Sequence, residues 1–110
     1  MSEIERPVRV SNAQMEWGSD PIAALLRDMK FDYIALTPGA SYRGLHDSLV
    51  NYLGNADPQM LLCVNEENAV AIAHGYAKVK EKPMAVAVHS NVGLMKATMA
   101  IFNAFGDRAP

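Results

Sequence analysis

The chain has 110 residues, half of which are hydrophobic and 20% of which are charged, and its formal net charge is −2. This composition is typical of a single globular domain and excludes an intrinsically disordered chain. The small negative charge, without a basic cluster, gives no reason to expect nucleic acid or a membrane as a partner. The single cysteine, Cys63, excludes a disulfide within the chain and is expected to be a small buried apolar residue.

The N-terminal residues carry no clear hydrophobic period. Residues 1–18 are therefore interpreted as an extended arm, and residues 19–110 as the folded domain. The first ten residues contain acids and lack the apolar stretch of a signal peptide, and no segment approaches the roughly 20 apolar residues of a membrane span. We therefore expect a cytoplasmic protein.

A helix is predicted over residues 19–30. Ser19 and Asp20 are candidate caps for its start, and Pro21 suits its first turn. The apolar residues that repeat on one face of this helix are Ile22, Leu25, Leu26 and Met29.

Three strands, each followed by a helix, are predicted in the rest of the chain. The strands are 31–37, 60–64 and 84–88, and the helices are Leu45–Leu53, a helix that begins at Glu66, and Leu94–Phe105. Gly54 suits a left-handed end of the first of these helices, and Asn65 suits a cap of the second. The alternation predicts an α/β fold, a three-layer α/β/α domain with a parallel sheet. Because the chain leaves its last helix where a fourth strand would be due, we expect a sheet truncated at the C-terminus.

Three segments follow the carboxyl ends of the predicted strands, which is the edge where open parallel sheets bind ligands. They read "TPGAS", "NEEN" and "HSNVG". Each alone has an ordinary explanation, as a turn, as acids that favour a helix N-terminus, and as helix caps. The chain has no glycine-rich phosphate loop and no serine-nucleophile motif, and its histidines, His46, His74 and His89, are too far apart in sequence to indicate a metal site.

Two adjacent carboxylates, Glu66 and Glu67, open the central helix. Glu66 shares a helical face with small residues that are expected to pack inward, whereas Glu67 lies about 100° further round and is expected to be solvated. The small residues on this face are Ala69, Val70, Ala73 and Ala77.

Three blocks of the sequence resemble the N-terminal pyrimidine-binding domain of thiamine-diphosphate enzymes, in the style of acetolactate synthase and benzoylformate decarboxylase. They are "FDYIALTPGASYRGLHDSL", "NEENAVAIAHGYAKVKEKPMAVAVHSNVGL" and "ATMAIFNAFGDRAP". The blocks keep the order and spacing of that family over about residues 20–110. The most specific part is the pattern E-x-x-A…A-x-G-Y-A…K-P.

The resemblance implies thiamine diphosphate as the cofactor. It further implies that the Glu66 carboxyl group hydrogen-bonds N1′ of the aminopyrimidine and so promotes loss of the proton from C2 of the thiazolium. His89 matches a histidine that relays protons in the benzoylformate decarboxylase branch. Pro38, Gly39 and Ser90 are implied, with Glu66, as cofactor-binding residues.

The chain departs from the family pattern at several positions. Asn65 precedes Glu66 where the family often has histidine, and Ala40 stands where benzoylformate decarboxylase has serine. A frequent Gly-Pro-Gly turn is replaced by Asn91, Val92 and Gly93. These differences bear on the substrate more than on the cofactor.

The family binds the cofactor's diphosphate and Mg²⁺ in a different domain, through a Gly-Asp-Gly motif and a later asparagine. No such segment is present, so no metal ligand is predicted in this chain. The resemblance therefore implies the pyrimidine-binding portion of a 2-oxo-acid decarboxylase or carboligase, inactive alone and partnered by a second copy or by a diphosphate-binding domain. Two alternatives stay open: a separate pyrimidine-domain subunit of a split decarboxylase, and a non-catalytic α/β interaction module in which Glu66 only caps a helix.

Overall fold

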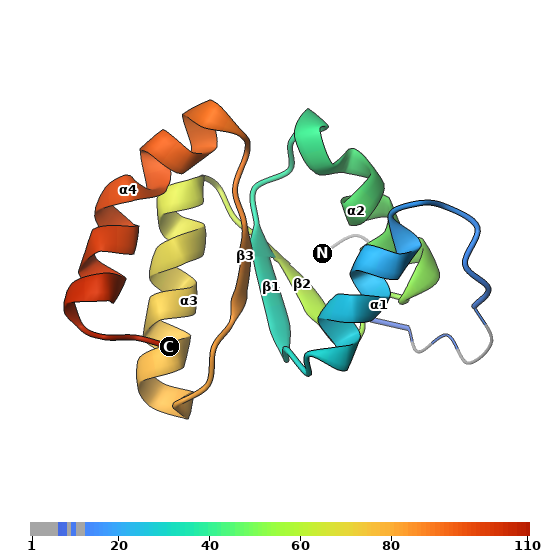
Figure 1. Ribbon diagram of the computed structural model, residues 1–110, viewed down its shortest axis with the longest axis horizontal. Helices are drawn as coiled ribbons and strands as arrows, with labels where there is room; N and C mark the ends of the chain where they lie inside the picture. Colours follow the sequence, from blue (N-terminus) through green and yellow to red (C-terminus); the bar gives the residue numbers. More distant parts are fainter. Residues whose placement is uncertain (1–6, 9, 11–12) are drawn as a thin grey trace.

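A computed structural model of the chain describes residues 7, 8, 10 and 13–110, so the predicted arm lies partly outside the described residues. Figure 1 shows the helices and strands along the chain. In chain order they are α1 (Asp20–Asp28), β1 (Tyr33–Leu36), the 3₁₀ turn η2 (Ala40–Tyr42), α2 (Arg43–Asp47), the π-helix η3 (Ser48–Tyr52), β2 (Gln59–Leu62), α3 (Glu66–Lys80), β3 (Ala85–Ala87) and α4 (Asn91–Gly106).

The three strands form one parallel sheet in the order β2-β1-β3. Ile34 in the central strand lies opposite Met60 in β2 and Ala85 in β3. The chain therefore moves from β1 to β2 in one direction and from β2 back across β1 to β3 in the other. The predicted parallel α/β sheet is confirmed.

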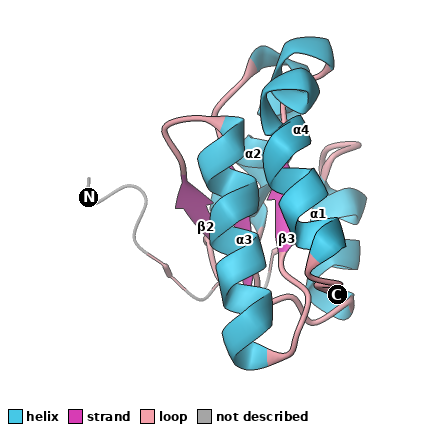
Figure 2. Cartoon of the chain, turned by 90° about the vertical axis from the view of Figure 1, so that its left-hand side faces the viewer, coloured by secondary structure: helices cyan, strands magenta, loops and turns pink. Residues whose placement is uncertain are grey.

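Helices cover both faces of this sheet, as Figures 1 and 2 show, with α1 and α2 on one face and α3 and α4 on the other. Parallel connections are right-handed, so two connections that run in opposite directions place their helices on opposite faces. The connection from β1 to β2 carries α2 and η3, and the connection from β2 to β3 carries α3. The expected three-layer α/β/α arrangement follows from this strand order.

Alternate residues of each strand pack into two different hydrophobic cores, one on each face of the sheet. Ile34, Leu36 and Met60 pack on the α1 side with Ala23, Leu49 and Leu53. On the α3 side, Ala35 packs with Cys63, Ala69, Ala73 and Met84. Burial raises the pKa of the Cys63 thiol, which keeps it protonated and agrees with its predicted role as a small buried residue.

The N-terminal end of α3 forms as the sequence predicts. The Asn65 side chain accepts a hydrogen bond from the backbone N–H of Asn68 at 2.9 Å and so caps the helix. The four small residues expected to pack inward are all buried: Ala69, Val70, Ala73 and Ala77. Gly75 has no atom within 4 Å of the position of a β-carbon, so close packing within the described chain does not explain it.

Two helices begin earlier than the sequence predicts. The second starts at Arg43 and continues as the π-helix η3, in which the Leu53 N–H donates to the Ser48 carbonyl at 3.0 Å. The last starts at Asn91, because the "HSNVG" segment is already helical from its third residue. Gly54 has a φ of 66°, as predicted for a left-handed helix end, and a β-carbon there would overlap the Val8 carbonyl oxygen.

The start of α1 differs from the predicted capping. Ser19 occupies the cap position but makes no side-chain capping bond. Asp20 instead accepts hydrogen bonds from the backbone N–H groups of Glu16 and Trp17, both at 2.9 Å, and from the Ser48 hydroxyl at 2.6 Å. Asp20 is buried, so its carboxylate ties the preceding turn and η3 to the start of α1.

The outer surfaces of α1 and α4 are apolar. Of the predicted apolar face of α1, only Leu26 packs against the core. Ile22, Leu25 and Met29 are exposed, and Ala23 is buried. On α4 only Gly93, Ala97 and Ala100 are buried, and the large apolar side chains that face outward are Val92, Leu94, Met95, Met99, Ile101, Phe102 and Phe105. Within the described part of the chain, no helix is long and apolar enough to cross a membrane.

We predict that Asp20→Asn destabilises the fold in a pH-dependent way. Hydrogen bonds from Ser48 and from the backbone of Glu16 and Trp17 hold the pKa of Asp20 below its ordinary value of 3.8. The charged form therefore contributes stability above that pH, and the contribution disappears as the pH falls through the lower folded-state pKa. The variant should melt several degrees lower than wild type at pH 7, and the gap should close in strong acid. Asp28→Asn, at the exposed end of α1, is the control, and an equal loss there would contradict the assignment.

We also predict that the chain associates into dimers or larger species. Large apolar side chains are exposed along α4, and association would remove them from water. Light scattering across a concentration series measures this directly. Phe102→Asp should shift the species towards the monomer, and a wild-type monomer at high concentration would show that the surface stays free.

Candidate active site

At the carboxyl ends of the neighbouring strands β1 and β3, the chain leaves the sheet towards opposite faces. The segment after β1 turns towards α2 on one face, and the segment after β3 turns into α4 on the other. In open α/β sheets, ligands usually bind at an edge where neighbouring segments diverge in this way. The expected site residues are found at this edge, and the region around Gly39, Glu66, His89 and Gly93 is termed the crevice.

Gly39 lies in the segment after β1 and approaches His89 closely. A β-carbon at Gly39 would be 2.5 Å from Cδ2 of the imidazole. The backbone of Gly39 is extended, with φ −156° and ψ 151°, so the turn geometry does not require glycine. The close approach of the two segments requires it. Pro38, the neighbouring residue, is exposed at the rim.

Tyr42 lies near two of the predicted residues, His89 and Glu66, but was not itself predicted. Its hydroxyl donates to the Thr37 carbonyl, and its ring lies 6.5 Å from the imidazole of His89 at a tilt of 58°. Burial, and secondly the nearby carboxylate of Glu66, raise the pKa of Tyr42. The phenol is therefore protonated at neutral pH. An aromatic residue in a segment at the ligand edge is the signal that would have found it.

Glu66 is the first residue of α3 and lies against the first turn of α4. A β-carbon at Gly93 would be 2.7 Å from Oε1 of Glu66 and 3.0 Å from its carboxyl carbon. Glu66 is half-buried, and its carboxylate has no hydrogen-bond partner among residues 13–110 or the described residues before them. Asn65 caps the helix, and the exposed Glu67 supplies a negative charge at the N-terminus of the helix. Glu66 is therefore not needed for either role. The two adjacent acids therefore differ as the sequence predicts.

His89 follows β3 and is half-buried, with its β-carbon 2.9 Å from the position of a β-carbon at Gly93. Ser90 is exposed, and its hydroxyl lies 3.4 Å from Nδ1 of the imidazole. One more polar group is found at this edge: the Thr37 hydroxyl is buried without a partner in the described structure. A buried group of this kind is available to a bound ligand.

The three histidines do not form a metal site. His74 lies 2.9 Å from Asp107, which also pairs with Lys78 at 2.7 Å, so these groups join α3 to the end of α4. Across the described residues, no group of three or more His, Cys, Asp or Glu side chains is close enough to hold a metal ion.

The residues at the crevice supply one carboxylate and two rings. Glu66 has no hydrogen-bond partner among the described residues, so its carboxylate can accept or share a proton with a ligand. His89 and Tyr42 supply the rings. Because a carboxylate repels a phosphate group, an uncharged or cationic part of a ligand fits beside Glu66 better than a phosphate does.

Comparison with known proteins gives the family. Residues 16–110 match the family model described as thiamine pyrophosphate enzyme, N-terminal TPP binding domain. The comparisons with curated proteins and with solved structures found no match. The family match spans the whole α/β/α domain and every residue of the crevice described above. The chain therefore belongs to the thiamine pyrophosphate enzymes, as their N-terminal TPP-binding domain.

Proposed function

We propose that the chain forms the pyrimidine-binding side of the active site of a thiamine-diphosphate-dependent 2-oxo-acid decarboxylase or carboligase. The observation that carries this proposal is the free, half-buried carboxylate of Glu66 against the bare backbone of Gly93. The carboxylate lies at the ligand edge and makes no hydrogen bond to the described residues, so it is available to a bound ligand. The family membership of residues 16–110 supports the cofactor.

Glu66 acts as the group that holds a proton at N1′ of the aminopyrimidine. Thiamine diphosphate, when bound, supplies a carbon that adds to the carbonyl group of a 2-oxo acid and accepts the electrons released by loss of carbon dioxide. Glu66 lies against the first turn of α4 at Gly93 and near Tyr42. A bound ligand that covered the rest of the carboxyl group would exclude water and strengthen its interaction with the ring nitrogen.

His89 is proposed as the group that moves protons near the substrate. His89 and Glu66 both lie against Gly93, and the imidazole lies close to Gly39 and to the ring of Tyr42. Ser90 and the exposed Pro38 line the entrance, where Ser90 reaches the imidazole. A relay histidine favours decarboxylase-like chemistry over the acetolactate synthase branch.

The diphosphate and its Mg²⁺ are proposed to bind to a second domain or to another subunit. The crevice offers a carboxylate, and the residues with contacts in it include no Lys or Arg. The apolar outer surface of α4 is where we expect that second domain, or a second copy of the chain, to pack. The same geometry serves a separate pyrimidine-domain subunit of a split decarboxylase equally well. The 110-residue chain alone is expected to be inactive in either case.

Glu66→Gln tests the assignment in the complete, cofactor-loaded enzyme. Glutamine keeps the size of the side chain but cannot share a proton with N1′, so the cofactor should still bind while exchange of its C2 proton slows. We expect a loss of roughly 10²-fold or more, the range for a positioned acid–base group. The measurement is C2–H exchange in deuterated buffer, followed by NMR.

The matched control for this measurement is Glu67→Gln. Glu67 is exposed in the same helical turn, so its loss should change only the electrostatics of the helix end. Unchanged C2–H exchange in Glu66→Gln, or an equal defect in Glu67→Gln, would contradict the role proposed for Glu66. A chain that supports no exchange in any assembly would favour the non-catalytic interaction module instead.

His89→Ala separates proton relay from cofactor binding. If His89 moves protons to or from the substrate, turnover should fall while the affinity for thiamine diphosphate stays within about twofold of wild type. Turnover assays and cofactor titration measure the two quantities separately. Loss of cofactor affinity in proportion to the loss of turnover would make His89 a structural residue.

A further inference from the structure

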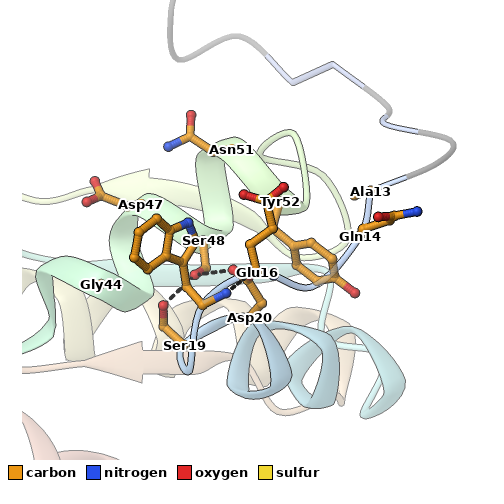
Figure 3. A pocket seen from close by; sticks show the side chains of 11 residues that line it. Ala13, Gln14, Glu16, Ser19, Asp20, Gly44, Asp47, Ser48, Asn51 and Tyr52 are labelled. Carbon is orange, nitrogen blue, oxygen red and sulfur yellow. Dashed lines mark hydrogen bonds between the residues drawn. The ribbon is translucent and has the colours of Figure 1, made fainter.

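A second cavity, with a volume of about 570 Å³, lies away from the crevice and shares none of its residues. Figure 3 shows it between the segment that carries Ala13, Gln14 and Glu16 and the helical segment that carries Asp47 and Asn51. Its volume is within the range of small-molecule binding sites. Nothing in the proposed function uses this cavity.

Hydrogen bonds fix the floor of the cavity. The buried Asp20 carboxylate accepts from Ser48 at 2.6 Å, and the Ser48 hydroxyl lies 2.7 Å from that of Ser19. The backbone N–H groups of Glu16 and Trp17 complete the shell of Asp20. The N-terminal segment that forms one wall is therefore anchored to the helices that form the other.

The lining of the cavity is negatively charged. It contains the carboxylates of Glu16, Asp20 and Asp47, and no Lys, Arg or His among its described residues. Neither Glu16 nor Asp47 forms an ion pair with any residue of the described ranges. Hydrogen bonds hold the pKa of Asp20 below its ordinary value, so this carboxylate is charged at neutral pH. The cavity therefore attracts cations.

Two aromatic rings, those of Trp17 and Tyr52, stand in the same lining. Trp17 is 73% exposed, although burial of an indole is strongly favourable. Aromatic faces attract organic cations, and cages of such rings with carboxylates are how proteins recognise ammonium groups. A metal ion is a poorer fit, because the carboxylates do not approach one another closely enough to coordinate one. We propose that this cavity binds a small organic ammonium ion, with Trp17 and Tyr52 against its carbon surface and Glu16 and Asp47 near its charge.

Trp17 provides the measurement, because it is the only tryptophan in the chain. Choline is the probe, and its uncharged isostere 3,3-dimethylbutan-1-ol is the matched ligand of the same shape. Both are titrated at constant ionic strength while tryptophan fluorescence is recorded, with free N-acetyltryptophanamide as the reference for direct quenching. We expect a saturable change with choline and binding of the isostere about tenfold weaker or more.

Variants then test the named side chains. Glu16→Gln combined with Asp47→Asn should weaken choline binding by about tenfold, whereas Glu81→Gln, at the exposed end of α3, should leave it unchanged. The comparison of choline with its isostere on the wild-type chain needs no variant, so a folding defect cannot obscure the result. Equal binding of the two probes, or no saturation by choline, would overturn the proposal.

Discussion

The close approach of α4 to the start of α3 is the constraint on which the candidate active site depends. A β-carbon at residue 93 would lie 2.7 Å from Oε1 of Glu66 and 2.9 Å from the β-carbon of His89, so a side chain there would displace both of these groups. Gly39 does the same for the segment after β1, where a β-carbon would meet the His89 ring at 2.5 Å. The two glycines thus leave room for the side chains of Glu66 and His89 at the strand ends.

The strand order explains why those three ends meet. With β1 in the middle of the sheet, the segments that leave β2 and β3 lie on either side of the segment that leaves β1. Right-handed connections then send the chain to opposite faces and open the crevice between β1 and β3. The small residues on the inner face of α3 let that helix lie close to the sheet, which fixes the height of Glu66 above the strand ends. The strand order therefore determines both the layers of the fold and the position of the candidate site.

Features set by neighbouring residues could be predicted from the sequence. The Asn65 cap, the inward face of α3 and the contrast between Glu66 and Glu67 follow from helical spacing and capping chemistry, which act within a few residues. The parallel α/β sheet follows from the alternation of patterns along the chain. The family resemblance added the cofactor and the choice of Glu66, which spacing alone would not have supplied.

Features set by distant contacts could not be predicted. Tyr42 gains its place only when His89 and Glu66 are brought beside it. The helical spacing of Ile22, Leu25 and Met29 indicates a shared face but not the direction in which it points, and Ala23 packs inward instead. Aspartate is a common helix cap, yet the Asp20 carboxylate accepts hydrogen bonds from the backbone of the preceding turn and from Ser48, 28 residues away in sequence.

The central claim is that Glu66 faces the aminopyrimidine at the crevice between β1 and β3. A crystal structure of the complete enzyme with thiamine diphosphate bound tests it most directly. The account predicts that a carboxyl oxygen of Glu66 lies within about 3.2 Å of N1′, with the ring over the bare backbone of Gly39 or Gly93. A structure in which N1′ contacts another group, or in which the pyrimidine lies away from the carboxyl ends of the strands, would contradict it.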